Sequence, residues 1–304
     1  MAEAATSVLT TSAYTRGALY GLAAVSIWAG NIVVAGVGLR SSLTPWDISA
    51  IRFGTAGLLL LAYLLRQGFA FERLGWMGLA ALALGGAPTV LLANCGLQFA
   101  PAAHAGALFP GVMPLMVVIL AAVVLKEVPT PQQGVGLVLI VTGVIGIVWG
   151  RGGSIGTTQN VGHLLFLGSA FAWACYTVAL RRARLDGLHA AAISAVGSAL
   201  LYLPPYAYLA GASLFEASLG AIALQAFVQG LLTAVISYVF YGRAIGILGA
   251  SSGAAFAALC PAMTALMAIP VLGEWPSAID WLAIILISIG VYVVSGGPLR
   301  GLRA

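Results

Sequence analysis

The residues of this chain that could bind a small molecule are polar and aromatic side chains placed inside long apolar segments. Trp28 and Asn31 lie in one such segment, and Trp173 and Tyr176 lie at matching places in a later one. An unpaired polar group is costly in an apolar medium, so such side chains usually face a cavity or a partner. We expect a polar and aromatic cavity; the alternatives are hydrogen bonds between helices and anchoring at a membrane surface. The candidate residues are Trp28, Asn31, Arg52, Asn94, Gln98, Trp173, Tyr176, Gln229, Tyr238 and Tyr241.

Arg52 is the charged member of this set. It lies well inside an apolar segment, with Asp47 close by in the same segment. One interpretation is an arginine that reaches the surface or pairs with Asp47; the other is an attraction for a substrate carboxylate. Arg243 lies near a segment end and is interpreted as a surface anchor. His104 begins a segment, and we interpret it as an interfacial histidine in preference to a proton relay.

Prolines inside the apolar segments predict where helices break. Proline lacks a backbone N–H, so it frees a carbonyl that could face a substrate. We expect breaks with a gating role, against the alternative of kinks that only aid packing. The prolines concerned are Pro88, Pro110, Pro114 and Pro261.

The composition places these residues in a membrane protein. The chain has 304 residues, of which 61% are hydrophobic and 7% charged, and its mean hydropathy is +1.05. A net charge of +5 could indicate nucleic acid in a soluble protein, but here the positions of the charges matter more than their sum, and we expect no nucleic-acid partner. The three cysteines lack metal-ligand spacing, and no Ser–His or paired-Asp arrangement is present. We therefore expect no enzyme activity, cofactor or metal.

Ten apolar runs are candidates for membrane spans, which need about 20 residues each. They are continuously apolar and do not alternate, so helices are favoured over a barrel. The predicted spans are Gly17 to Leu39, Trp46 to Leu65, Leu74 to Phe99, Ala103 to Leu125, Gln132 to Trp149, Val161 to Leu180, Ala190 to Leu209, Ser218 to Leu248, Ala250 to Leu272 and Ser277 to Val294.

The second half of the chain repeats the first. Residues 102–150 align without a gap on residues 249–297, with Pro114 on Pro261 and Glu127 on Glu274. Roughly a third of these positions are identical, which indicates an internal duplication. With the offset shortened by two residues, the match extends to the N-terminal part of each half. Five spans per half is an odd number, so the second copy enters the membrane from the opposite side, and the repeats are inverted.

The Lys and Arg distribution supports one orientation. If the N-terminus is cytoplasmic, the outer segments hold only Arg40 and Arg151. The inner segments then hold Arg16, Arg66, Arg73, Lys126, Arg181, Arg182, Arg184, Arg300 and Arg303. We predict a protein of the cytoplasmic (inner) membrane with both termini cytoplasmic. Its predicted parts are tails 1–16 and 298–304, a first repeat 17–150, a linker 151–160 and a second repeat 161–297.

Acidic groups are predicted to stay out of the span cores. Glu127 and Glu274 mark span ends, Asp47 lies in a first helical turn, and Asp280 is assigned to an outer loop. A proton-coupled exporter of organic cations needs an embedded carboxylate. If the chain transports a substrate, we therefore expect it to be neutral, zwitterionic or anionic, with uncoupled or weakly coupled flow.

The repeated pattern resembles the EamA repeat of the drug/metabolite transporter superfamily. In each copy a proline precedes a span-end glutamate, as Pro114 precedes Glu127 and Pro261 precedes Glu274, followed by Pro and a glycine-containing span. The chain also looks like the YddG-like group of amino-acid exporters. The resemblance implies an all-α bundle of ten transmembrane helices, two inverted five-helix repeats around a central cavity, that exports by alternating access. One departure is Gly273, which stands where the first copy has Lys126.

These observations together predict a secondary transporter that exports small metabolites, with amino acids, aromatic or otherwise neutral, as the expected substrates. It is expected to be a monomer whose partners are its substrate and membrane lipid. One alternative is a transporter of sugar phosphates or nucleotide sugars. Another is a membrane assembly or sensor subunit that transports nothing.

Overall fold

The computed structural model describes residues 11–150, 158–209, 213–249 and 255–296, and within these ranges the chain forms helices and no strand. Nine helical segments in this part are long and apolar enough to cross a membrane, and Ala278–Val294 is a shorter apolar helix of 17 residues. Many large apolar side chains, such as Leu58 and Trp76, face outward. Exposure on this scale suits lipid and not water. The prediction of an all-α multi-pass membrane protein is confirmed.

The helices follow the predicted spans, but several of those spans are divided. The third span consists of α3 and α4, the fourth of α5 and α6, and the eighth of α10, η2 and α11. In the first half the elements are α1 (Thr11–Arg40), α2 (Pro45–Gln67), α3 (Phe71–Leu84), α4 (Ala87–Gly96), α5 (Ala102–Leu108), α6 (Met113–Val124) and α7 (Pro131–Trp149). In the second half they are α8 (Thr158–Ala183), α9 (Gly187–Leu209), η1 (Ser213–Glu216), α10 (Leu219–Gln225), η2 (Ala226–Ile236), α11 (Ser237–Leu248), α13 (Cys260–Leu272) and α14 (Ala278–Val294).

The predicted tails and linker lie mostly outside the described residues. Residues 11–16, expected in the N-terminal tail, already belong to α1. Of the expected linker 151–160, residues 158–160 form the start of α8. The C-terminal tail 298–304 is not among the described residues.

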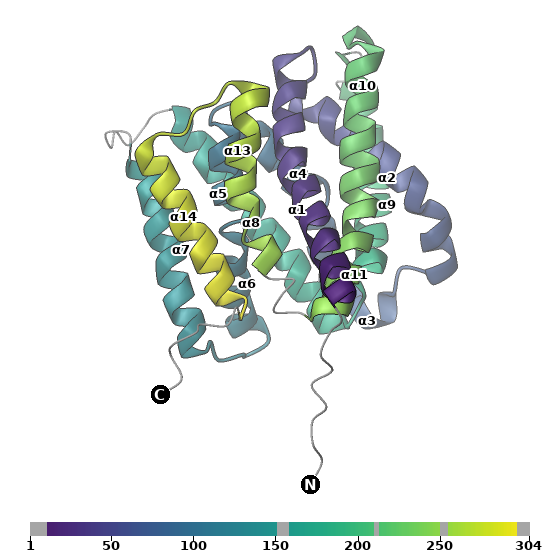
Figure 1. Ribbon diagram of the computed structural model, residues 1–304. Coiled ribbons are helices and arrows are strands. Elements are labelled where there is room, and N and C mark those ends of the chain that lie inside the picture. The colour runs from purple at the N-terminus through teal and green to yellow at the C-terminus, as the bar shows by residue number, and fades with distance from the viewer. Residues whose placement is uncertain (1–10, 151–157, 210–212, 250–254, 297–304) are drawn as a thin grey trace.

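The two halves run in opposite directions through the bundle. In Figure 1 the turn between α6 and α7, which carries Glu127, lies at the lower end, and the turn between α13 and α14, which carries Glu274, lies at the upper end. We call these the Glu127 end and the Glu274 end. Helix α1 begins and α14 finishes at the Glu127 end. This arrangement is the inverted repeat that an odd number of spans per half requires.

Capping boxes fix where several helices begin. The Ser277 hydroxyl accepts a hydrogen bond from the backbone N–H of Asp280, and the Asp280 carboxylate accepts from the Ser277 backbone, which starts α14. Asp280 is 1% exposed. The sequence-based assignment of Asp280 to an outer loop is therefore wrong, because the cap places this residue in the first turn of α14, where its side chain is buried.

Helices α7 and α14 pack against each other at one side of the bundle (Figure 1). Glycines allow the close approach, as in other membrane helix pairs. A methyl group on Gly290 would lie 2.8 Å from the Gly136 carbonyl oxygen and 2.9 Å from the Ile140 nitrogen. The fifth and tenth spans, which are duplicates of each other, thus form a tightly packed pair.

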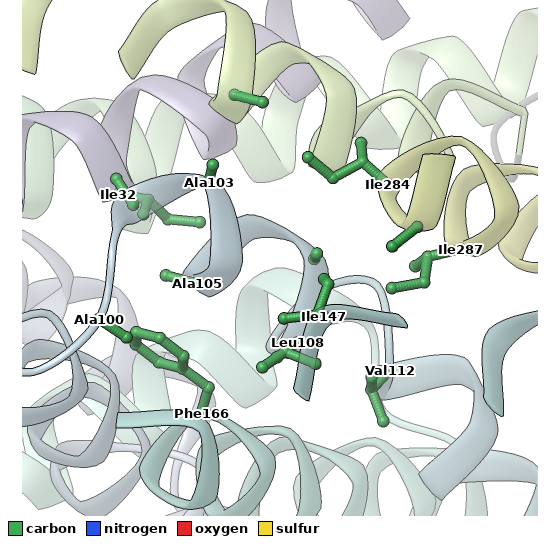
Figure 2. Packing of buried hydrophobic residues seen from close by; sticks show 14 of the residues in the cluster. Ile32, Ala100, Ala103, Ala105, Leu108, Val112, Ile147, Phe166, Ile284 and Ile287 are labelled. Carbon is green, nitrogen blue, oxygen red and sulfur yellow. The ribbon is translucent and has the colours of Figure 1, made fainter. Parts of the chain in front are cut away.

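The apolar core joins elements of both halves. Figure 2 shows Leu108 of α5 and Phe166 of α8 in one buried cluster that also includes Ile147 of α7 and Ile284 and Ile287 of α14. All five side chains are almost completely buried. The short helix α5 is held in the middle of this cluster, and each of its seven residues is buried.

Each of the four singled-out prolines lies at a helix break. Pro88, Pro114 and Pro261 stand in the first turns of α4, α6 and α13, and Pro110 lies between α5 and α6. Proline suits the first turn because the N–H it lacks has no partner there. The positions of these breaks agree with the sequence prediction, and their role in gating remains a prediction.

Candidate substrate site

A cavity of about 30 Å³ lies between the two halves of the chain. Arg52 and the break between α3 and α4 contribute from the first half, and Trp173, Tyr176 and Tyr238 contribute from the second. Four predicted site residues therefore meet at one place. The lining residues are Arg52, Phe53, Ala56, Gly85, Gly86, Val90, Trp173, Tyr176, Ala191, Ser194, Ala195, Ala234 and Tyr238.

Arg52 is held by amide groups from both halves. Its Nη1 donates to the Gln229 Oε1 atom at 3.1 Å and lies 3.4 Å from the Asn31 Oδ1 atom. The Gln229 amide donates to the Asn31 carbonyl at 3.3 Å, and the Thr233 hydroxyl oxygen lies 3.3 Å from the Asn31 Oδ1 atom. Amides are neutral, so this network fixes the guanidinium in place and leaves its charge uncompensated.

The interpretation that Asp47 neutralises Arg52 is wrong. Asp47 forms the capping box of α2 with Thr44, and its other oxygen accepts a hydrogen bond from the Tyr206 hydroxyl of α9. Asp47 is fully buried in this arrangement. Arg52 lies more than a helical turn further along α2 and bonds to amides instead.

The predicted tryptophans occupy related places in the two halves. Trp173 packs on Tyr176 with ring centres 4.9 Å apart, and Trp28 packs on Tyr241 at the same distance. The Trp28 indole also donates to the Ser237 hydroxyl at 2.9 Å. Partly or fully buried aromatic rings with a polar edge suit a substrate that is both apolar and polar.

Helix η2 is a π-helix of 11 residues that carries Gln229 and Thr233. The Thr233 hydroxyl donates a hydrogen bond to the Val228 carbonyl, five residues earlier, at 2.7 Å. This spacing of five residues fits the wide turns of a π-helix. π-Helical turns are rare in proteins overall, and those that occur often lie at functional sites. The span predicted from Ser218 to Leu248 is one continuous helix, and its hydropathy gives no sign of a change from α-helical to π-helical turns.

Two further predicted residues lie apart from the cavity wall. Asn94 is buried in α4 and donates to the Ser49 hydroxyl at 3.3 Å, one turn from Arg52 along α2. Gln98 follows the end of α4 and is exposed, because that helix finishes at Gly96. The structure therefore brings Asn94 near the network and leaves Gln98 outside it.

The break between α3 and α4 exposes backbone groups inside the apolar region, and side chains satisfy them. The Ser198 hydroxyl accepts from the Ala87 N–H, and the Ser194 hydroxyl donates to the Leu82 carbonyl, both at 3.0 Å. Irregular backbone is tolerated at this depth only with such partners. Gly85 packs so closely that a methyl group there would lie 2.3 Å from the Tyr176 Cβ atom.

Ser198→Ala is expected to destabilise the protein, because the buried Ala87 N–H would lose its partner. We expect a loss of about 1–3 kcal/mol in the free energy of unfolding, measured as a lower melting temperature in detergent. Ser26→Ala is the matched control, since the Ser26 hydroxyl bonds only within its own helix, to the Leu22 carbonyl. Equal melting temperatures for the two variants would contradict the role given to Ser198.

The cavity is too small for an amino acid in this conformation. A volume of about 30 Å³ holds one or two water molecules, whereas ligand pockets commonly measure about 300–1,000 Å³. Binding of a metabolite at this place requires the two halves to separate.

Ion pairs join the two halves at both ends of the bundle. Arg40, at the end of α1, pairs with Glu274 at 2.7 Å and also donates to the Leu272 carbonyl. Arg181, near the end of α8, pairs with Glu127 at 2.9 Å. Helices α1 and α8 are the first helices of their repeats, and the two glutamates correspond by the duplication. Each pair thus joins the first helix of one repeat to the span-end glutamate of the other repeat.

His104 is buried by protein, and its interfacial position remains a prediction. Its side chain is 2% exposed and bonds to His163 and Asp280, because the whole of α5 is embedded in the core. Arg243 is exposed and its guanidinium lies 5.6 Å from the ring centre of Tyr20, which agrees with a surface position.

These features define a multi-pass helical membrane protein built from two repeats, with a small polar cavity between them. The profile of the EamA-like transporter family matches residues 15–149 and 160–296, so the chain belongs to this family of the drug/metabolite transporter superfamily. It is a transporter of that family.

The comparison with individual proteins agrees with this assignment. An uncharacterized transporter of Bacillus subtilis (strain 168), YyaM, is 28% identical over 267 residues, which cover 83% of this chain and 85% of the relative. A solved crystal structure matches with a TM-score of 0.60 and 23% identity, covering 92% of this chain and 96% of its own. The latter likeness concerns the fold alone.

Proposed function

We propose that this protein is a secondary transporter that exports amino acids, aromatic or otherwise neutral, across the cytoplasmic membrane. The observation that carries the proposal is the Arg52 guanidinium, held by neutral amides beside Trp173, Tyr176 and Tyr238 in a cavity between the repeats. An arginine binds a carboxylate through charge and paired hydrogen bonds. The neighbouring rings suit an apolar or aromatic side chain.

Alternating access is the mechanism that we infer for this transport. The Arg40–Glu274 and Arg181–Glu127 pairs are both formed, and the cavity between them is small. Opening one pair at a time would enlarge the cavity toward one side of the membrane. Pro88, at the break beside the cavity, and the other helix breaks are where the backbone would bend. We place both termini and the Glu127 end in the cytoplasm, and the protein acts as a monomer with lipid and substrate as its partners.

Sugar phosphates are the second candidate substrates, and the cavity argues against them. A doubly negative group would call for several cationic side chains, whereas Arg52 is the one Lys or Arg among the residues that line the cavity. Arg243, the other candidate considered from the sequence, is exposed and absent from that lining.

Counterflow in proteoliposomes tests this function. Vesicles loaded with unlabelled phenylalanine are expected to take up labelled phenylalanine, while vesicles loaded with phenethylamine, which lacks the carboxylate, or with glucose 6-phosphate are expected to take up little of their own label. Exchange of glucose 6-phosphate without exchange of any amino acid would contradict the substrate class. No exchange with a wider panel of amino acids would favour a subunit that transports nothing.

A further inference from the structure

The structure contains a buried chain of three titratable side chains that the proposed substrate site does not use. The His104 Nε2 atom lies 3.1 Å from the Asp280 Oδ1 atom, and the His104 Nδ1 atom lies 3.0 Å from the His163 Nε2 atom. The His104 and Asp280 side chains are each 2% exposed, and His163 is 4% exposed. The three residues belong to α5, α14 and α8, so the chain crosses from the first repeat to the second.

The hydrogen-bond geometry fixes how protons are placed in this chain when Asp280 is ionised. The carboxylate accepts a hydrogen bond from the His104 Nε2–H group, so in neutral His104 the Nδ1 atom accepts a hydrogen bond from His163 Nε2. His163 Nδ1 is then a bare acceptor, and it is a buried atom with no hydrogen-bond partner among the described residues. A buried nitrogen without a hydrogen-bond partner costs free energy, so its presence calls for an explanation such as a functional role.

A pocket of about 190 Å³ gives water access to this chain. His104 and Asp280 line it together with Glu274, Trp275 and Pro276 of the turn at the Glu274 end. Trp275 is exposed, which places the pocket at the end of the bundle. By the orientation proposed above, this end faces the outside of the cell.

Glu274 and Gln159 also lie beside the chain, and Glu274 is already paired with other groups. Glu274 bonds through one oxygen to Arg40 and through the other to the Ala102 N–H at 2.7 Å. From α8, the Gln159 amide lies 3.5 Å from His104 Nδ1. Asp280 is thus the negative charge that faces the two histidines.

The duplication shows that this arrangement is present once and not twice. The positions that correspond to His104, His163 and Asp280 in the other copy are Ser251, Ala18 and Gln133, none of which titrates. Gln133 still forms the capping box of α7 with Thr130, as Asp280 does with Ser277. A capping role alone therefore requires no carboxylate, and the acidic and imidazole groups at the Glu274 end need another explanation.

We propose that His104, His163 and Asp280 form a proton-binding site, and that one proton enters the cell through it for each substrate molecule exported. The coupling half of this proposal rests on the proposed function, whereas the binding half does not. It replaces the expectation of uncoupled flow, which relied on the absence of a buried carboxylate.

The proton balance of the site is simple. Once the site has bound one proton, His163 carries a proton on Nδ1, and the proton that was on His163 Nε2 has moved to His104 Nδ1. His104 then carries a proton on each nitrogen and forms an imidazolium–carboxylate pair with Asp280, so the net charge of the site changes from −1 to zero. This pair joins α5 to α14 beside the Arg40–Glu274 contact. Proton binding therefore holds the Glu274 end closed and returns the carrier to its inward-open form.

Proton binding can be tested without any substrate, because the chain contains three histidines. In protein labelled with ¹³C in the histidine rings, we expect the signals of His104 and His163 to change together when the sample is taken from about pH 8 to about pH 4. His189, which bonds to the Gly68 carbonyl, is the internal reference. In Asp280→Asn the joint change is expected to disappear. Its persistence in that variant, or its absence from the wild type, would overturn the site.

Coupling is tested with a pH-sensitive dye inside proteoliposomes. Outward phenylalanine flow is expected to acidify the lumen of vesicles that contain the wild-type protein. Asp280→Asn and His163→Gln are each expected to reduce this proton signal at least tenfold. Phenylalanine counterflow by both variants is expected to stay within twofold of the wild type. Asp47→Asn is the matched control, since Asp47 also starts a buried helix with a capping box but has no histidine partner. A proton signal unchanged in both site variants overturns the coupling. Failure of wild-type counterflow overturns the proposed function and leaves the ring titration to decide the site.

Discussion

Arg52→Ala is expected to raise the half-saturation concentration for phenylalanine counterflow about 100-fold, which corresponds to about 3 kcal/mol. The guanidinium is the one formal charge among the residues that line the cavity. Without it, the carboxylate of a bound substrate would lose a charge-assisted hydrogen bond. Arg52→Lys is expected to recover only part of this loss, because an ammonium group cannot form the paired contacts of a guanidinium. The measurement is initial exchange rate against phenylalanine concentration.

Arg243→Ala is the matched control for this prediction. Arg243 lies on α11, close in sequence to Tyr238, but its side chain is exposed and stacks over Tyr20. We expect its kinetic constants to stay within twofold of the wild type. An Arg52→Ala protein that keeps its melting temperature and exchanges phenylalanine with an unchanged half-saturation concentration would remove Arg52 from the substrate site.

Gly290→Leu is expected to prevent the formation of a stable bundle. A side chain at this position would overlap the Gly136 carbonyl and the Ile140 backbone, and neither can move without separating α7 from α14. Overpacking against backbone costs about 3 kcal/mol or more. Most of the variant should therefore appear as aggregate in size-exclusion chromatography in detergent, and the remainder should unfold at a lower temperature.

Gly134→Leu controls for the size of the new side chain. Gly134 lies on α7, but a Cβ atom added to it would have no neighbour within 4 Å. This variant is expected to give the monodisperse peak and melting temperature of the wild type. Similar losses in both variants would mean that the close contact between α7 and α14 has no special part in stability.

The arrangement of the spans was predictable because it depends on signals that are local in the chain. Apolar runs locate the helices, Pro88 and Pro114 locate two of their breaks, and the duplication fixes the inversion. The correspondence between the positions of Trp28 and Trp173 in the two repeats also followed from the duplication alone. Each of these inferences needed only hydropathy, proline chemistry or alignment of the chain with itself.

Contacts between distant segments could not be predicted in the same way. Arg52 has a possible partner nearby in sequence, Asp47, but its actual partner Gln229 comes from the other repeat. The burial of His104 between α8 and α14 was not predictable either, because it depends on α5 entering the core among helices that are distant in sequence. For Asp280 a signal did exist: Ser277 three residues earlier completes a capping box and predicts a helical position.

The π-helical turns of η2 make this part of the chain sensitive to length in a way that its hydropathy does not suggest. Each residue of an α-helix turns the chain by about 100°. Removal of one residue between Ala226 and Ile236, with a return to ordinary α-helical turns, would rotate Tyr238 and Tyr241 relative to Gln229 and change the direction in which their rings point. Relatives with a one-residue deletion here would thus present a different set of side chains to their cargo, with no substitution in the binding residues themselves.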